Sequence, residues 1–206
     1  MQINIDKKTG VFLAIITLLL AAVISLSINH SDNDGFMGMG HNSNNDMGMH
    51  HNSKGEYTGA DIMFLQMMIP HHQQAIDISN LALKTSKDSE LLALAKIIIA
   101  AQSSEIAQMK SWLTDAGAGT DMGHSMDGMG GMLDENELSA LAAATGKNFN
   151  ILWLKAMIGH HDGAIHMTTM IRDASNKEIK AFGQNVLKDQ SAQITQMEGM
   201  LKRITP

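Results

Sequence analysis

The sequence contains no cysteine, only 2 prolines and few aromatic residues, which make up 4% of its 206 positions. Without cysteine the chain cannot form a disulfide, a thiolate nucleophile, a Cys-ligated zinc site, an iron–sulfur cluster, covalently attached haem or a lipoprotein anchor. Basic residues are also few: 15 Lys and Arg stand against 21 Asp and Glu, without a basic stripe. This charge balance argues against nucleic-acid binding, which depends on clustered Lys and Arg.

Methionine and histidine are abundant by contrast, with 18 and 10 residues. Thioether sulfur suits soft ions such as Cu(I), and imidazole binds a wider range of metals. A methionine on a helix is otherwise a flexible core residue, so its position decides between the two interpretations. Hydrophobic residues make up 44% of the chain, enough for a core, and the scarcity of proline favours helices.

The N-terminal segment predicts export. Residues 11–28 carry no charge and follow Lys7 and Lys8. Such a run is typical of a secretory signal or of a single membrane anchor, and the poor cleavage site at residues 25–27 favours the anchor. In both cases the lysines stay inside and the rest is exported to the periplasm or another extracytoplasmic space. We therefore expect residues 1–30 to be an anchor or signal peptide, with the membrane as a partner through this helix.

Two tracts combine glycine and polar residues with methionine and histidine, and they contain almost no aliphatic residue. They cannot bury enough apolar surface to fold, so we expect a disordered linker at 31–56 and a loop at 117–132. Their thioethers and imidazoles fill no core, which favours metal capture over a plain solvated linker. They comprise Met37, Met39, His41, Met47, Met49, His50 and His51 in the first tract, and Met122, His124, Met126, Met129 and Met132 in the second.

The remainder, residues 57–206, is an internal repeat. Residues 64–76 match residues 153–165 at an offset of 89, and residues 102–109 match 190–197 at an offset of 88. Each repeat is typical of a helical hairpin, and two hairpins predict an all-α four-helix bundle without strands.

Capping boxes mark the expected helix starts at Thr58, Asp134 and Ser175. The Asp134 box opens a short helix that ends before Gly146. The second long helix is expected from about Ser86 to just before Gly117, and the third from about 148 to 172.

Steps of four and three residues define the inward seam of each long helix. Four seams carry polar or sulfur-containing residues at matching positions: Met68 and His72; Gln102, Glu105 and Met109; Met157 and His161; Gln190, Gln193 and Met197. Met and His four apart can reach one point beside a helix. The four Gln and Glu residues either lie at the bundle boundary or bond the second imidazole nitrogen of a metal-bound histidine.

His71 and His160 lie about 100° around the helix from these seams, where they either complete a site or bind something at the surface. Pro70 and Gly159 precede them and loosen both helices, and Pro70 predicts a kink. Met63, Met67 and Met167 are expected in the core. His166 and Met170, four residues apart, form a weaker candidate pair.

The doubled Met-Ile-x-His-His motif, at residues 68–72 and 157–161, resembles the domain-of-unknown-function 305 (DUF305) family over about residues 56–204. The resemblance implies a ferritin-like four-helix bundle, commonly exported. Members of the CopM type are periplasmic copper-binding proteins linked to copper resistance. By position, the implied ligands are Met68, His71, His72, Met157, His160 and His161, with nearby Met109 and Met197.

The leading hypothesis is an exported protein without enzymatic activity that sequesters copper or passes it to a copper-transport partner protein. Cu(I) is favoured, with Cu(II) or Ag(I) as alternatives, and the ligands include Met122, His124 and Met126. Neutral imidazole is the ligand form, so binding is expected to weaken below about pH 6.

Two alternatives remain open at this point. One is a ferritin-like oxidase of Cu(I) or Fe(II), although a di-iron site needs Glu-x-x-His motifs that the sequence lacks. The other is a helical interaction module that binds no metal, in which the repeat serves packing alone.

Overall fold

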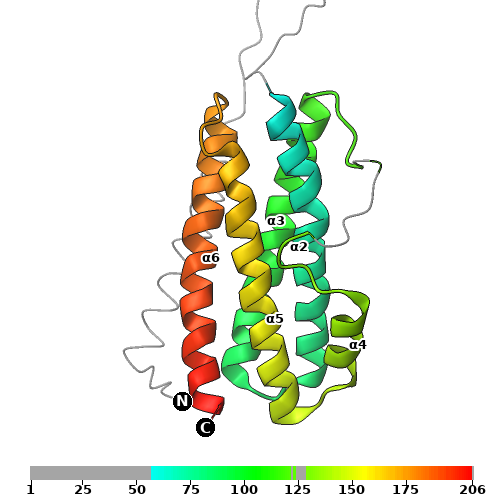
Figure 1. The fold of residues 1–206 in the computed structure, drawn as a ribbon, viewed down its shortest axis with the longest axis vertical. Coiled ribbons are helices and arrows are strands. Elements are labelled where there is room, and N and C mark those ends of the chain that lie inside the picture. The colour runs from blue at the N-terminus through cyan, green and yellow to red at the C-terminus, as the bar shows by residue number, and fades with distance from the viewer. Residues whose placement is uncertain (1–56, 122, 124–128, 206) are drawn as a thin grey trace, which may run out of the picture. The chain divides into compact units, whose positions relative to one another are not determined.

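The computed structural model describes residues 57–121, 123 and 129–205 (Figure 1). This part of the chain contains no β-strand. Its helices are α2 Gly59–Thr85, α3 Ser89–Asp115, α4 Glu135–Ala143, α5 Gly146–Met167, the 3-10 helix η1 Thr168–Ile171, and α6 Lys177–Ile204. The expected anchor and the first Met/His tract lie outside the described residues. Among the residues that are described, no helix is both long and apolar enough to cross a bilayer.

Two antiparallel hairpins form the bundle, as the repeat predicts. Helix α2 packs along α3, α5 packs along α6, and the hairpins meet where α2 contacts α5. Figure 1 shows α2 and α6 running in one direction and α3 and α5 in the other. The chain therefore crosses the length of the bundle between α3 and α5, with α4 on the way. One long crossover is the connection found in ferritin-like bundles.

The helix starts follow from local capping chemistry. The Thr58 hydroxyl accepts the Asp61 amide at 3.2 Å, and the Asp61 carboxylate accepts the Thr58 amide at 2.8 Å, which confirms the first capping box. Asp134 and Glu137 form the second reciprocal box at the start of α4. The box predicted at Ser175 is wrong. The Asn176 side chain caps α6 instead, because its Oδ1 accepts the amides two and three residues ahead.

Two other expectations concern the end of α5 and the helix at Pro70. Helix α5 does not continue in α form to residue 172, because its last turn tightens into η1. There the hydroxyls of Thr168 and Thr169 donate to backbone carbonyls three residues back, both at 2.7 Å. The helix at Pro70 behaves differently: α2 continues through this residue without interruption.

The predicted seams form the interior of the bundle. Every seam residue named above is buried except Glu105 and Gln193, which are partly buried. Apolar side chains form two clusters, one on either side of a polar layer. The Phe64 cluster includes Phe64, Leu65, Met68, Met109, Ala164, Met167 and Val186, and the Trp153 cluster includes Ala75, Leu91, Ile98, Trp153, Leu154, Met157 and Met197.

Of the methionines expected in the core, Met167 is buried and Met67 is partly buried against the Phe64 cluster. The expectation for Met63 is wrong, because its side chain is 46% exposed. Met63 lies outside the seam of α2, on the face that no other helix covers.

Candidate metal centre

The polar layer between the two apolar clusters holds four histidines. His71 and His72 come from the middle of α2, and His160 and His161 come from the middle of α5. All four side chains are fully buried, at 0% exposure. Helices α2 and α5 run antiparallel (Figure 1), so the two histidine pairs meet because each lies near the middle of its helix.

The two histidines on the flanks of the seams form the centre of this layer. The ring centroids of His71 and His160 lie 3.8 Å apart, whereas each ring lies 6.4 Å from that of its neighbour in the chain. None of the four nitrogens in this pair makes a hydrogen bond. The alternative that placed these residues at the surface is wrong, because the contact between α2 and α5 and the adjoining crossover exclude solvent.

The two outer histidines are oriented by side chains from the partner helices. His72 Nε2 lies 2.7 Å from Glu105 Oε2, and His161 Nε2 lies 2.6 Å from Gln193 Oε1. Because both partners are oxygen acceptors, each ring donates from Nε2 and keeps a lone pair on Nδ1. Both Nδ1 atoms are buried without a partner. This is the arrangement in which a hydrogen bond at one nitrogen prepares the other as a ligand.

The other two candidate partners do not contact the histidines by hydrogen bonds. Gln102 and Gln190 are buried in the same layer, and the Oε1 atom of each has no hydrogen-bond partner. Of the four Gln and Glu residues named from the sequence, the structure therefore brings Glu105 and Gln193 to the imidazoles. The other two add unpaired polar atoms to the layer.

Burial favours the neutral form of His71, His160 and His161. It lowers the pKa of His71 to about 3, with a further decrease from neighbouring His72, and it lowers the pKa of His161 to about 4. The pKa of His160 is also well below its ordinary value, first because of burial and then because of His71. The expectation that ligand binding weakens below about pH 6 rests on an ordinary histidine pKa. The lowered pKa values of His71 and His161 move the expected loss of their lone pairs to lower pH.

The donor set around the pair is small. Among the described residues, no three side chains of His, Asp or Glu converge well enough to hold a metal ion. A metal between His71 and His160 would take its further donors from sulfur or from a rearranged imidazole. The structure thus offers two nitrogens whose lone pairs are unused, which fits a soft ion better than a hard one that prefers carboxylates.

The helical methionines flank this layer. Met68 and Met109 are fully buried in the Phe64 cluster, and their repeat equivalents Met157 and Met197 are fully buried in the Trp153 cluster. Each cluster thus presents two thioethers. The three candidates of the second tract, Met122, His124 and Met126, lie outside the described residues. His166 is exposed and Met170 is partly buried.

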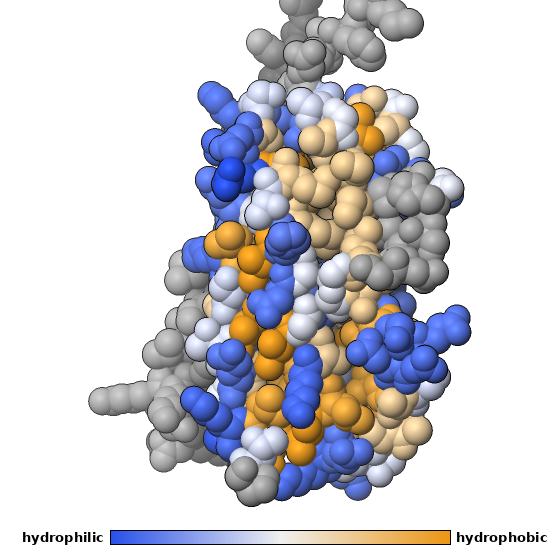
Figure 2. Space-filling view, viewed as in Figure 1, coloured by the Kyte–Doolittle hydropathy of each residue, from blue (hydrophilic) through white to orange (hydrophobic). Residues whose placement is uncertain are grey.

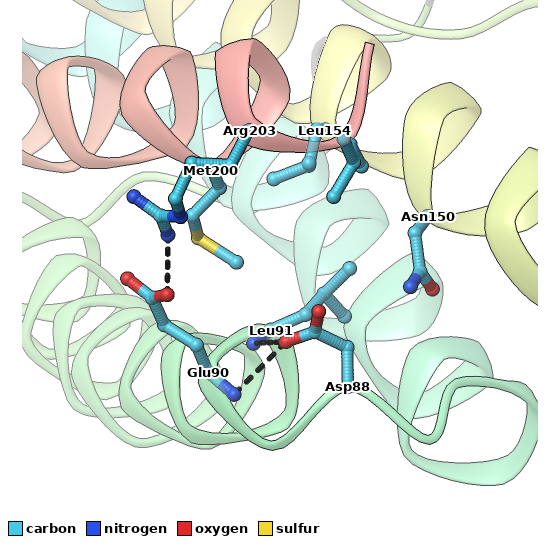
Figure 3. Close-up of a pocket in the computed structure, with 8 residues that line it drawn as sticks. Asp88, Glu90, Leu91, Asn150, Leu154, Met200 and Arg203 are labelled. Atoms are coloured by element: carbon cyan, nitrogen blue, oxygen red, sulfur yellow. Dashed lines mark hydrogen bonds and ion pairs between the residues drawn. The ribbon is translucent and has the colours of Figure 1, made fainter. Parts of the chain in front are cut away.

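The described residues also enclose a small cavity away from this layer. A cavity of about 50 Å³ lies where α3 and α5 begin and α6 ends (Figure 3). Arg203 pairs with Glu90 beside it, and the Asp88 carboxylate caps α3 there. This volume accommodates a water molecule or two and no organic substrate.

In Figure 2 apolar residues gather along the middle of the visible face, broken and flanked by hydrophilic ones. Leu187 on α6 and Met63 on α2 are the large hydrophobic residues exposed among those described.

Comparison with known proteins agrees with the repeat and its motif. The family model described as Domain of unknown function (DUF305) matches residues 61–201. The chain belongs to the DUF305 family. A search of curated proteins returns no match.

Solved structures of DUF305 proteins resemble the bundle. A DUF305 fragment from Deinococcus radiodurans is 30% identical, with a TM-score of 0.67, and the match covers 71% of this chain and 97% of that one. A protein of Streptomyces coelicolor, described as a candidate secreted DUF305 protein, is 27% identical, with a TM-score of 0.67 and coverage of 70% and 92%.

CopM is also similar. Its Cu(I)-bound form is 32% identical, with a TM-score of 0.61 and coverage of 73% of this chain and 100% of that one. CopM has also been solved with Cu(II) and with Ag.

Sequence reasoning missed three residues beside the centre. Gly131 and Gly163 bring the crossover against α5, and Gln74 binds the crossover backbone from α2. A glycine in the middle of a helix carries a signal, because it lowers helix stability and is kept where another backbone approaches closely. Gly163, two residues after His161, meets that description.

Proposed function

We propose that this protein binds copper outside the cytoplasm, to sequester it or to pass it on, and that His71 and His160 hold the ion. The observation that carries the proposal is the set of six buried imidazole nitrogens without hydrogen-bond partners in one layer. Leaving a buried polar atom unpaired costs about 1–3 kcal/mol. A fold that keeps six of them is poorly explained by packing alone, and a bound cation would satisfy nitrogens that carry a lone pair, of which each neutral ring has one.

The chemistry of the layer supports Cu(I), with Ag(I) as its analogue. Two neutral imidazoles face each other, thioethers lie above and below them, and no carboxylate contacts the central pair in the described structure. Nitrogen and thioether donors favour soft ions. The copper-bound and silver-bound forms of CopM support the same assignment by similarity.

The absence of cysteine suits an oxidising compartment. A location outside the cytoplasm is supported by the charge-free run at residues 11–28 and by the relative described as a candidate secreted protein. Membrane attachment through this run and a copper-transport partner protein are further parts of the proposal.

The proposal includes no catalytic step. A di-iron oxidase site would need several carboxylates in the bundle interior. Here Glu105 is the carboxylate that contacts the histidine layer, and it is occupied by His72. An interaction module without metal would leave the unpaired nitrogens without a role.

The test is a titration of the full chain with Cu(I) against a coloured Cu(I) chelator, beside the variant H71L/H160L. Leucine fills a similar volume without nitrogen, so the bundle is retained while the central donors are lost. We expect the tightest Cu(I) site to disappear in this variant. Undiminished tight binding would contradict the proposal and assign the copper to the Met/His tracts.

A matched control is H166L. His166 lies on the same helix as His160 but is exposed. We expect this variant to bind the tightest Cu(I) ion as the wild type does. A similar loss of tight Cu(I) binding in both variants would mean that the measured affinity depends on how many histidines the chain has. It would not then depend on the buried pair.

A further inference from the structure

The crossover segment 129–133 lies against α5 with backbone in direct contact with backbone. A Cβ at Gly163 would lie 1.9 Å from the Gly130 carbonyl oxygen, and one at Gly131 would lie 2.4 Å from the Gly159 carbonyl oxygen. Gly131 also has a φ of 84°, which side-chain-bearing residues rarely adopt. Only glycine at these positions allows the segment to lie so close to the turn of α5 that carries His160 and His161.

Helix α2 holds the same segment from the other side. The Gln74 side chain accepts the Leu133 amide at 2.8 Å and donates to the Leu133 carbonyl at 2.9 Å. One helical turn earlier than Pro70, Gln66 donates to the Gly119 carbonyl at 2.7 Å, which fixes the start of the second tract against α2. The segment thus bridges α2 and α5, and its contacts on α5 are with Gly159, His160 and Gly163.

This position brings a methionine to the edge of the layer. The backbone of Gly131 lies against that of His160, since a Cβ at Gly131 would be 3.0 Å from the His160 Cα atom. Met129, two residues before Gly131, is partly buried and packs against the Phe64 cluster, which contains Met68, Ala164 and Met167. Ala164 and Met68 are each within one helical turn of a histidine of the central pair. The thioether of Met129 therefore lies on the side of the histidine layer that the Phe64 cluster occupies.

We propose that Met129 is a sulfur donor to the metal held by His71 and His160, and that Gly131, Gly163 and Gln74 position it. This inference rests on the proposed copper function. Met129 would supply a third metal ligand, because among the described residues no third His, Asp or Glu joins the pair. Since Met129 belongs to the second Met/His tract, a metal bound by its sulfur would also link this tract to the buried site.

The glycines permit a test in which the fold is preserved. Gly159 and Gly163 both lie on α5, and alanine at either position increases helix propensity by about 1 kcal/mol. A Cβ at Gly159 meets nothing within 4 Å, whereas one at Gly163 collides with the Gly130 carbonyl. The variant G159A is therefore a matched control for G163A, which displaces the segment. The third variant, M129L, keeps the apolar packing and removes only the sulfur.

Each full-length variant is loaded with one equivalent of Cu(I), its affinity is measured by chelator competition, and sulfur neighbours of copper are counted by X-ray absorption. We expect M129L and G163A to bind at least about tenfold more weakly, because losing one ligand or its positioning group typically costs 10–100-fold. M129L should also lose one sulfur neighbour, and G159A should match the wild type.

Wild-type affinity or an unchanged sulfur count in M129L would overturn the inference while leaving the proposed function in place. Wild-type affinity in G163A would overturn the positioning by the glycine contact. A wild-type chain that binds no Cu(I) would instead contradict the proposed function, so the two failures are distinguishable.

Discussion

The buried histidines make the stability of the metal-free bundle depend strongly on acid. In the unfolded chain a histidine has a pKa of about 6.5 and binds a proton almost completely at pH 5. In the folded protein the pKa values of His71 and His161 are about 3 and about 4, so both rings stay neutral at that pH. The unfolded state therefore binds more protons, and stability falls as pH decreases through 6.5 towards these folded-state values.

The size of the effect follows from these pKa values. A difference of one unit between the pKa of a group in the folded state and its pKa in the unfolded state corresponds to about 1.4 kcal/mol. Between pH 7 and pH 5 each of the two residues should lower the free energy of unfolding by about 2 kcal/mol, so the pair contributes about 4 kcal/mol. His160 acts in the same direction, because its pKa is also lowered.

The assay is urea denaturation of chelator-treated protein at both pH values, for the wild type and for H71Q/H161Q. Glutamine does not titrate, so the loss between pH 7 and pH 5 should be smaller by about 4 kcal/mol in the variant. The difference between two pH values is the readout, so any general destabilisation by the substitutions cancels. Asp189, whose pKa is raised by burial, is common to both proteins and cancels as well. Equal losses in both proteins would refute the account of buried neutral imidazoles.

Three further predictions concern single features of the bundle. The variant H71L/H160L should stabilise the metal-free protein by about 2–4 kcal/mol, since it removes buried unpaired nitrogens, and a calorimetric melting temperature below that of the wild type would contradict this. Replacing Glu105 by Leu should destabilise the metal-free protein by about 1–3 kcal/mol in urea denaturation, because the buried His72 Nε2 loses its acceptor. Glu105→Gln keeps an acceptor and should retain most of that stability. Thr58→Ala should cost about 1 kcal/mol in urea denaturation, because the first capping box is lost, and an unchanged midpoint would count against that role.

Much of the fold was predictable because its determinants are local or periodic. The repeat predicts two hairpins, the four- and three-residue steps identify the buried seams, and the boxes at Thr58 and Asp134 mark two helix starts. The start of α6 was misplaced by one residue because Asn176 competes with Ser175 for the same amides. Such competition depends on backbone geometry that a motif does not contain.

The candidate site was predictable in part. The seams place His72 and His161 inside, together with Glu105 and Gln193, because matching steps on neighbouring helices meet. The contact between His71 and His160 depends on which face of α2 meets α5. The sequence leaves this choice open, since a flank position can face either a helix or solvent.

For a related reason, neither the low histidine pKa values nor the docking of segment 129–133 could be predicted from the sequence. Both arise from long-range burial: the crossover returns over α5 only because Gly131 and Gly163 allow backbone contact. A glycine pattern alone does not show which distant backbone it admits.

The most direct test of the central claim is the location of Ag(I), the redox-inert analogue of Cu(I), by anomalous scattering from crystals grown with one equivalent of silver. The account predicts a single strong peak within bonding distance of a nitrogen of His71 and a nitrogen of His160. Silver bound elsewhere, with this pair still unliganded, would contradict it.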